Sequence, residues 1–133
     1  MSQENVEVIR RLYEHWTTGD FPADPFDPDV EHSRIGAQTP DMEGRWLGLD
    51  EFSTVFREYL QALSDLRIEA ERIIDLSGDR VLVLSRQTAR GKQSGVPVEH
   101  ELGELFTLRD GKIVRYESYW NRAEALEAAG LRE

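Results

Sequence analysis

The feature that most constrains the fold is a change of hydrophobic period near residue 65. Before this point apolar residues recur at helical spacing, and after it they alternate with polar residues as in half-buried strands. The alternating part divides into four segments, and Asp110-Gly111 between the last two is a strong signal for a two-residue hairpin. Strands so close in sequence predict an antiparallel meander. We expect these strands at residues 66–76, 80–90, 98–109 and 112–120.

The part of the chain before residue 65 predicts two amphipathic helices and one short strand. The helices cover residues 3–18 and 49–63, and each carries an apolar stripe. The strand covers residues 30–35, after a proline-rich segment at 21–29 that predicts a turn or a distorted short helix. A polar loop at residues 36–48 is long enough to predict a role at the rim of a site.

The end of the chain predicts a short third helix, because Asn121 is a good N-cap for residues 122–129 and Gly130 is a good stop. The order helix, strand, helix and four strands predicts an α+β domain that covers residues 1–133. A curled antiparallel sheet closed by helices encloses a pocket in this arrangement. We expect an apolar small molecule as its ligand.

Charge and composition exclude several classes of function. The net charge is −10, which disfavours binding to nucleic acid or to an anionic membrane surface. The chain has no cysteine, so disulfides and thiolate chemistry are excluded. Its histidines lack metal-site spacing, and no glycine-rich phosphate loop follows a strand. We therefore expect no metal and no cofactor, and a cytoplasmic location because no signal peptide or membrane-spanning stretch is evident.

The segment Val81-Leu82-Val83-Leu84 is apolar on both faces of its predicted strand. One face can meet the helices, and the other needs a second cover. A partner subunit supplies that cover most simply, so we expect a homodimer. The polar residues Glu99 and Glu101 on the next strand weaken this argument.

Five local signatures follow one another along the chain: Gly19-Asp20, the segment 26–30, the segment 44–50, the hairpin 105–116 and the terminal segment 121–131. Their order resembles the SnoaL-like branch of the nuclear transport factor 2-like superfamily, which also includes ketosteroid isomerases and limonene epoxide hydrolases. The resemblance covers nearly the whole chain and implies a cone-shaped, curved antiparallel sheet wrapped around helices that enclose a pocket, the ketosteroid isomerase-like (cystatin-like) α+β barrel.

The resemblance also implies which strand positions face the pocket. It places Glu104 where ketosteroid isomerases have a pocket carboxylic acid. Alternation alone cannot choose between the faces, because both carry apolar residues. The implied inward set is His100, Leu102, Glu104 and Phe106, with Leu82, Leu84, Arg86 and Thr88 on one neighbouring strand and Val114, Tyr116, Ser118 and Trp120 on the other.

Two interpretations of Glu104 remain open at this point. An apolar surround would raise the pKa of its carboxyl group and keep it protonated, able to donate a hydrogen bond to a developing oxyanion. Alternatively, an inward Arg86 would hold Glu104 ionised in a structural ion pair.

His32 is the expected general base, because imidazole titrates near neutral pH. It lies near the place of the catalytic aspartate of ketosteroid isomerases, although a shift of register would put Arg34 there instead. The oxyanion tyrosine of those enzymes is not matched, since Leu12 has its spacing from Gly19 and Tyr13 is one step away. The aspartate pair of limonene epoxide hydrolases is not matched either.

These observations give two hypotheses. The first is a cofactor-independent isomerase, cyclase or hydrolase that acts by acid–base chemistry on an apolar ring or carbonyl substrate. The second is a non-catalytic ligand-binding or dimerisation module of the same fold. In the first, Glu104 is the acid or oxyanion donor, His32 the base and Arg86 their electrostatic partner. The expected pocket walls, several of which would serve equally as core residues, are Tyr13, Trp16, Trp46, Phe56, Tyr59, Leu84, His100, Leu102, Phe106, Tyr116, Ser118 and Trp120.

Overall fold

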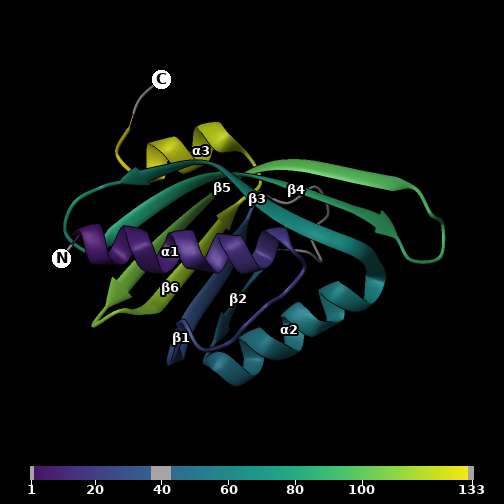
Figure 1. The fold of residues 1–133 in the computed structure, drawn as a ribbon, viewed down its shortest axis with the longest axis horizontal. Helices are drawn as coiled ribbons and strands as arrows, with labels where there is room; N and C mark the ends of the chain where they lie inside the picture. The colour runs from purple at the N-terminus through teal and green to yellow at the C-terminus, as the bar shows by residue number, and fades with distance from the viewer. Residues whose placement is uncertain (1, 37–42, 132–133) are drawn as a thin grey trace.

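The computed structural model describes residues 2–36 and 43–131. In these residues, three helices pack against one curved, open, mixed sheet (Figure 1). The helices are α1 (Ser2–Thr17), α2 (Leu49–Ala62) and α3 (Arg122–Ala128). The strands are β1 (Phe26–Ile35), β2 (Gly44–Leu47), β3 (Leu63–Asp75), β4 (Arg80–Gly91), β5 (Pro97–Arg109) and β6 (Lys112–Tyr119).

The strand order is β2-β1-β6-β5-β4-β3. Strands β3 to β6 form the predicted antiparallel meander, in which each strand pairs with the next along the chain. Strand β1 joins the free edge of β6 in parallel, and β2 pairs antiparallel with β1. The α+β class and the curved sheet are confirmed, but the sheet is mixed rather than wholly antiparallel.

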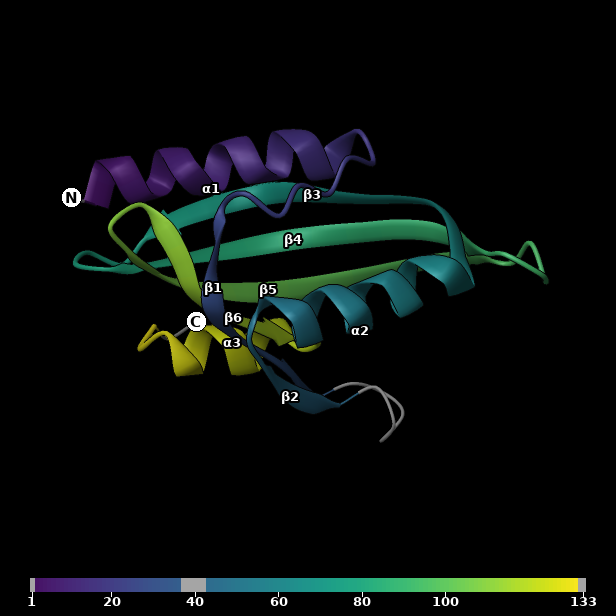
Figure 2. The same ribbon diagram turned by 90° about the horizontal axis from the view of Figure 1, so that it is seen from below.

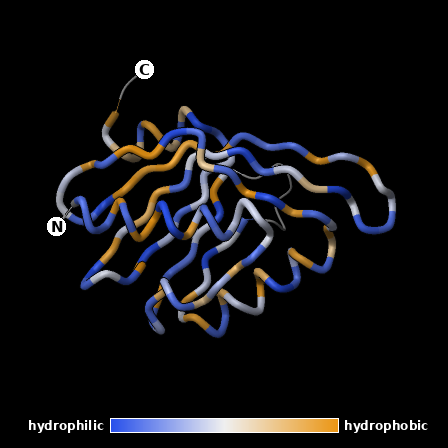
Figure 3. The backbone as a smooth tube through the Cα atoms, viewed as in Figure 1, coloured by the Kyte–Doolittle hydropathy of each residue, from blue (hydrophilic) through white to orange (hydrophobic). Residues whose placement is uncertain are grey.

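Two hydrophobic clusters lie on the two faces of the sheet. The larger contains side chains of α1, α2 and the strands, with Trp16 and Phe106 at its centre. The smaller lies beneath α3 and includes Leu82, Leu105 and Leu126. Figure 2 shows α1 and α3 on opposite sides of the sheet, and Figure 3 shows the alternation of hydrophobic and hydrophilic residues along its strands.

Helix α3 changes the argument for a partner subunit. Leu82 is fully buried within the single chain, because its face of β4 lies under the Ala125 and Leu126 side chains of α3. The second apolar face of β4 therefore has a cover from its own chain. The homodimer stays a prediction, but an uncovered apolar face of β4 no longer supports it.

Three local expectations need correction. The first strand begins at Phe26 rather than at residue 30, because residues 26–35 pair along β6 with one irregularity between Phe26 and Glu31. The segment predicted as a loop at 36–48 contains β2, and its residues 37–42 lie outside the described residues. The proline-rich segment forms a turn that leads directly into β1.

Among the described residues, no helix is both long and apolar enough to cross a membrane.

Candidate functional site

The register between β4 and β5 decides which side chains face the concave interior. Directly opposed antiparallel partners share a face. Glu104 is paired with Val83, and Leu102 with Ser85. The inward residues of β4 are therefore Val83, Ser85 and Gln87, one position out of phase with the predicted set.

The prediction that Leu82, Leu84, Arg86 and Thr88 face the pocket is consequently wrong. Leu84 packs in the cluster beneath α3. On β6, Tyr116, Ser118 and Trp120 line the interior as expected. Val114 does not belong to the core, and Ile113 is buried in its place, because the pairing with β5 shifts between Thr107 and Leu108.

Glu104 is the centre of a buried hydrogen-bond cluster. Its Oε1 accepts hydrogen bonds from the hydroxyl of Tyr13 at 2.5 Å and of Ser85 at 2.9 Å. Its Oε2 accepts a short hydrogen bond from the Tyr116 hydroxyl and a long one, at 3.5 Å, from Ser118. The carboxyl group is 2 % exposed and all its hydrogen-bonding partners are uncharged.

Burial is the main influence on the acidity of this cluster. It raises the pKa of Glu104, and the four hydroxyl groups that donate to the carboxylate lower that pKa by a smaller amount. Burial also raises the pKa values of Tyr13 and Tyr116 well above the ordinary value for tyrosine, and the neighbouring Glu104 adds to both shifts. Both phenols therefore keep their protons and act as donors.

A small cavity lies beside Glu104, beneath α2. Its volume of about 20 Å³ is room for roughly one water molecule. Tyr116 and Ser118, the partners of Oε2, line this cavity, whereas Tyr13 and Ser85, the partners of Oε1, do not. Oε2 is therefore the atom that faces a ligand. The lining residues are His32, Arg34, Phe56, Tyr59, Ile68, Gln87, Leu102, Glu104, Tyr116, Ser118 and Trp120.

His32 is buried at the cavity, with 2 % of its surface exposed. Its Nδ1 lies 3.0 Å from the backbone oxygen of Tyr116. Because a carbonyl oxygen can only accept, Nδ1 carries the proton and Nε2 carries the free lone pair. Burial lowers the pKa of His32 to about 3, so the imidazole is neutral near neutral pH. The ring stacks between Trp46 and Tyr116, with centroids 5.5 Å and 4.6 Å away.

Arg34 follows His32 on the same face of β1, and both residues reach the cavity. Its guanidinium lies 5.2 Å from the ring centroid of Trp46 and 5.1 Å from that of Tyr59. Burial lowers the pKa of Arg34. His32 and Arg34, which the sequence offered as alternatives, therefore both face inward, because residues two apart in a strand share a face.

Arg86 lies on the opposite face of the sheet, in an exposed ion-pair network. Its guanidinium is 3.0 Å from Glu71, 2.6 Å from Glu99 and 3.6 Å from Glu101. The predicted pair of Arg86 with Glu104 is not formed. The placement of Arg86 at the catalytic centre is wrong, because the register of β4 turns its side chain away.

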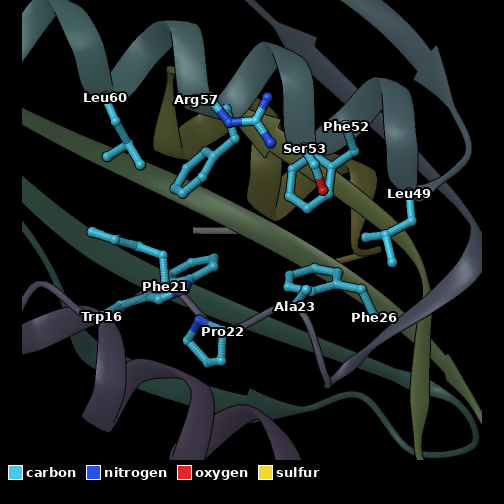
Figure 4. Close-up of a pocket in the computed structure, with 11 residues that line it drawn as sticks. Trp16, Phe21, Pro22, Ala23, Phe26, Leu49, Phe52, Ser53, Arg57 and Leu60 are labelled. Atoms are coloured by element: carbon cyan, nitrogen blue, oxygen red, sulfur yellow. The ribbon is translucent and has the colours of Figure 1, made fainter.

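A second, larger hollow adjoins the cavity between α2 and the segment that follows α1 (Figure 4). Its volume is about 220 Å³, and its walls are mainly apolar, with Ser53 and Arg57 as polar lining residues. Trp16 and Phe56 line this hollow, and Phe56 lines the cavity as well. The Phe56 side chain thus lies between the two spaces.

The other predicted wall residues fall in different places. Tyr13 and Phe106 are buried behind the cavity, where the Phe106 ring stacks on Tyr116 at 4.8 Å. His100 contacts the edge of Trp120 at 4.7 Å, outside the cavity lining. The sequence interpretation missed Ser85 and Gln87. Residues 85–88 are all polar, so alternation gave no signal that would place Ser85 and Gln87 on the inward face.

No three histidine, aspartate or glutamate side chains in the described part of the chain come together in a way that could hold a metal ion. The polar groups that line the cavity are hydroxyl, carboxyl, amide, imidazole and guanidinium groups.

Comparison with known structures identifies the same architecture elsewhere. A nuclear transport factor 2-like protein of unknown function from Burkholderia pseudomallei is 22% identical, with a TM-score of 0.76, over 93% of this chain and 95% of that one. A putative SnoaL-like polyketide cyclase from Jannaschia is 19% identical, with a TM-score of 0.74, over 98% and 94%. An epoxide hydrolase of the limonene epoxide hydrolase-like kind from M. tuberculosis is 16% identical, with a TM-score of 0.71, over 96% and 90%.

No curated protein matches the chain in sequence. The family model of the SnoaL-like domain matches residues 9–116, which include the whole of α2 and the residues Glu104, His32 and Tyr116. The chain therefore belongs to the SnoaL-like domain family.

Proposed function

We propose that the protein is a cofactor-independent enzyme that moves a proton next to the carbonyl group of an apolar ring compound. The observation that carries this proposal is the convergence of Glu104 Oε2, the Tyr116 hydroxyl and a neutral His32 on one buried cavity. Acid and base groups of different kinds on one cavity are typical of proton-transfer sites.

The acid side of the reaction is Glu104 with Tyr116. In its protonated form, Glu104 accepts from Tyr13 and Ser85 through Oε1 and can donate from Oε2 to the carbonyl oxygen of a substrate. Oε2 accepts a short hydrogen bond from Tyr116 and only a long one, at 3.5 Å, from Ser118, so the substrate oxygen would take the place of the Ser118 contact. Donors placed before the reaction stabilise the negative charge that develops on an enolate oxygen.

The base side is the Nε2 atom of His32. It accepts the proton from the carbon beside the carbonyl group. The electron pair of the C–H bond forms a carbon–carbon double bond, and the π pair of the carbonyl group moves onto the oxygen, which becomes an enolate oxygen held by the Glu104 proton. The low pKa of His32 makes it a weak base in the empty cavity. The negative charge that develops on the substrate in the transition state would favour the imidazolium form and offset this weakness.

The apolar hollow supplies the room that the cavity lacks. A ring compound does not fit in about 20 Å³, but the adjoining hollow measures about 220 Å³. Rotation of the Phe56 side chain would join the two spaces. The ring would then lie against Trp16 and Phe52, and the carbonyl group would reach Glu104.

The names of similar structures agree with this class of chemistry. They include a putative isomerase from Bacillus subtilis and the putative polyketide cyclase described above. These names belong to those proteins, and the assignment to this chain rests on its own cavity.

The test is the exchange of the carbonyl-adjacent hydrogens of 1-indanone for deuterium in D₂O, followed by proton NMR. We expect the wild-type protein to accelerate exchange over buffer. Glu104→Gln and His32→Gln should each reduce the acceleration by about a hundredfold or more. Glu101→Gln is the matched control, because Glu101 lies on the same strand but is exposed on the other face.

Binding of 1-indanone without faster exchange would contradict the enzymatic proposal and leave a non-catalytic binding module. Equal loss of exchange in Glu101→Gln and Glu104→Gln would also contradict it, because the effect would not belong to the cavity.

A further inference from the structure

One end of the cavity is composed of hydrogen-bond donors and a cation. Arg34 has no carboxylate within ion-pair distance in the part of the chain that the structure describes, and its guanidinium is held by the faces of Trp46 and Tyr59. Arg34 is partly buried, and even partial removal of a cation from water without a counterion is unfavourable, a cost that aromatic faces offset only in part. The structure thus leaves a positive charge at the cavity for a ligand to neutralise.

The second observation at this end is an unused donor. The indole Nε1 of Trp120 is buried and has no hydrogen-bond partner among the described residues. Trp120 lines the same cavity as Arg34. Buried donors of this kind are rare in folded proteins, and a missing ligand is one explanation.

A third donor belongs to Tyr59. Its hydroxyl oxygen accepts a short hydrogen bond from the amide nitrogen of Gln87, so its own hydrogen is free to be donated. Burial raises the pKa of Tyr59 to about 12, which keeps that hydrogen in place. Three donors from three different elements, Arg34 on β1, Tyr59 on α2 and Trp120 after β6, therefore line one end of the cavity.

The pairing of β1 with β6 separates this end from the acid–base end. His32 is opposite Tyr116, and Arg34 is opposite Ser118. Two residues along a strand correspond to about 6–7 Å. That distance is more than one functional group spans, so a ligand held at both ends would carry its two polar groups on different atoms of a ring.

We propose that Arg34, Tyr59 and the indole nitrogen of Trp120 bind a carboxylate group of the ligand, so that the substrate is a ring keto acid rather than a neutral ketone. A carboxylate fits because its two oxygens accept several hydrogen bonds in one plane, and a guanidinium donates to them in matched pairs. The presence of a carbonyl group in the ligand rests on the proposed function. The carboxylate site rests only on the three donors Arg34, Tyr59 and Trp120.

The experiment compares 1-indanone, 3-oxoindane-1-carboxylate and its methyl ester, with binding followed by NMR titration. The ester keeps the shape of the acid and removes its charge. We expect the wild-type protein to bind the carboxylate at least about tenfold more tightly than the ester. This comparison needs no variant, so it does not depend on the folding of one.

Arg34→Gln should abolish the preference for the carboxylate over the ester. Arg115→Gln is the matched control, because Arg115 lies on β6 with an exposed side chain. It should keep the preference. Equal wild-type affinities for acid and ester would overturn the carboxylate site, as would a preference that survives in Arg34→Gln.

The outcomes separate this inference from the proposed function. Accelerated exchange of 1-indanone without a preference for the carboxylate would overturn the inference and leave the enzyme proposal intact. A preference that depends on Arg34, without accelerated exchange of either ketone, would support the carboxylate site and contradict the enzyme.

Discussion

At the scale of single residues, the two oxygens of Glu104 have different surroundings. Oε1 is turned to the core, where Tyr13 and Ser85 hold it, and Oε2 is turned to the cavity beside Tyr116. Tyr13 therefore acts through Glu104 and does not touch a ligand. Tyr13 is one residue away from the position that matches the ketosteroid isomerase tyrosine. Its hydroxyl contacts the Glu104 carboxyl group on the core side, away from the cavity.

Tyr13→Phe should raise the pKa of Glu104 further, because the hydrogen bond from Tyr13 to the carboxylate lowers that pKa in the intact protein. The carboxyl carbon of Glu104, observed by ¹³C NMR in a pH titration, measures the change. Tyr119→Phe is the control, since the Tyr119 hydroxyl contacts Glu117 on the other face of the sheet. An unchanged or lowered pKa in Tyr13→Phe would remove Tyr13 from this positioning role.

His32 makes the stability of the protein depend on pH. Its folded-state pKa, about 3, lies below the unfolded value near 6.5, so the unfolded chain takes up a proton first as the pH falls. Stability from this group is complete above pH 6.5 and declines toward pH 3. Between about pH 7 and about pH 5 the loss should be about 2 kcal/mol.

Urea unfolding of the wild type and His32→Gln at both pH values measures this contribution. In His32→Gln, the difference in the free energy of unfolding between pH 7 and pH 5 should be about 2 kcal/mol smaller than in the wild type. A wild-type difference retained in His32→Gln would mean that other groups control the acid response.

Sequence reasoning and the structure agree on cavity residues of β1, α2, β5 and β6 and on Trp120, directly after β6. Glu104 and Tyr116 were placed through a resemblance and a clear Asp110-Gly111 hairpin, which sets the register of β5 with β6. Arg86 was misplaced because the connection between β4 and β5 does not define a register, and both faces of β4 carry apolar residues. No pattern in the sequence distinguishes a face that meets the cavity from one that meets α3.

At the scale of elements, the close approach of α3 to the sheet depends on Gly103. A Cβ atom at this position would lie 2.2 Å from the Cβ of Ala125, far inside contact distance. This glycine is therefore required for space, since no positive φ is found at it. Helix α3 could not cover Leu82 and Leu105 as closely with a larger residue there.

Gly103→Ala should destabilise the protein by about 1–3 kcal/mol, because α3 must move away from β5. Chemical denaturation measures the loss. In the double variant Gly103→Ala with Ala125→Gly, the clashing methyl group is removed, and part of the stability should return despite the cost of glycine in a helix. This contact would be contradicted if the double variant lost more stability than the two single variants lose together.

Helix α2 controls the size of the site through Phe56. Phe56→Ala should join the cavity to the apolar hollow and increase the affinity for a neutral ketone larger than 1-indanone, such as acenaphthenone, by about tenfold. The matched control is Leu60→Ala, which enlarges the hollow without touching the cavity lining. NMR titration measures both. Equal gains in the two variants would show that Phe56 does not separate the spaces.

The elements themselves were mostly evident from hydrophobic period, and their pairing was less so. Both long helices and the meander follow from periodicity and turn residues. The short β2 was missed because four residues give too little alternation to recognise, and its neighbours 37–42 are polar. The parallel pairing of β1 with β6 was also missed, because it joins segments separated by most of the chain.

At the scale of the whole molecule, charge bears on self-association. Each chain carries a net charge of −10, and the face of β3, β4 and β5 beside α3 presents the charged network of Arg86, Glu71, Glu99 and Glu101. Two such chains repel each other at long range, and salt screens that repulsion. A homodimer therefore has to form against an electrostatic cost that depends on ionic strength.

We expect the homodimer to be favoured by salt. Sedimentation velocity at a fixed protein concentration, between about 20 mM and about 300 mM NaCl, should show the dimer fraction rising as the screening length falls below about 10 Å. Arg86→Glu should lower the dimer fraction at low salt, because it raises the negative charge of each chain by two. Arg109→Glu makes the same change of charge at the β5–β6 turn, away from the network. If only net charge matters, both variants should lower the dimer fraction equally, and a larger effect of Arg86→Glu would indicate a local role of the network. A chain that is monomeric at every salt concentration would contradict the homodimer, and the cavity, enclosed within one chain, would be unaffected by that result.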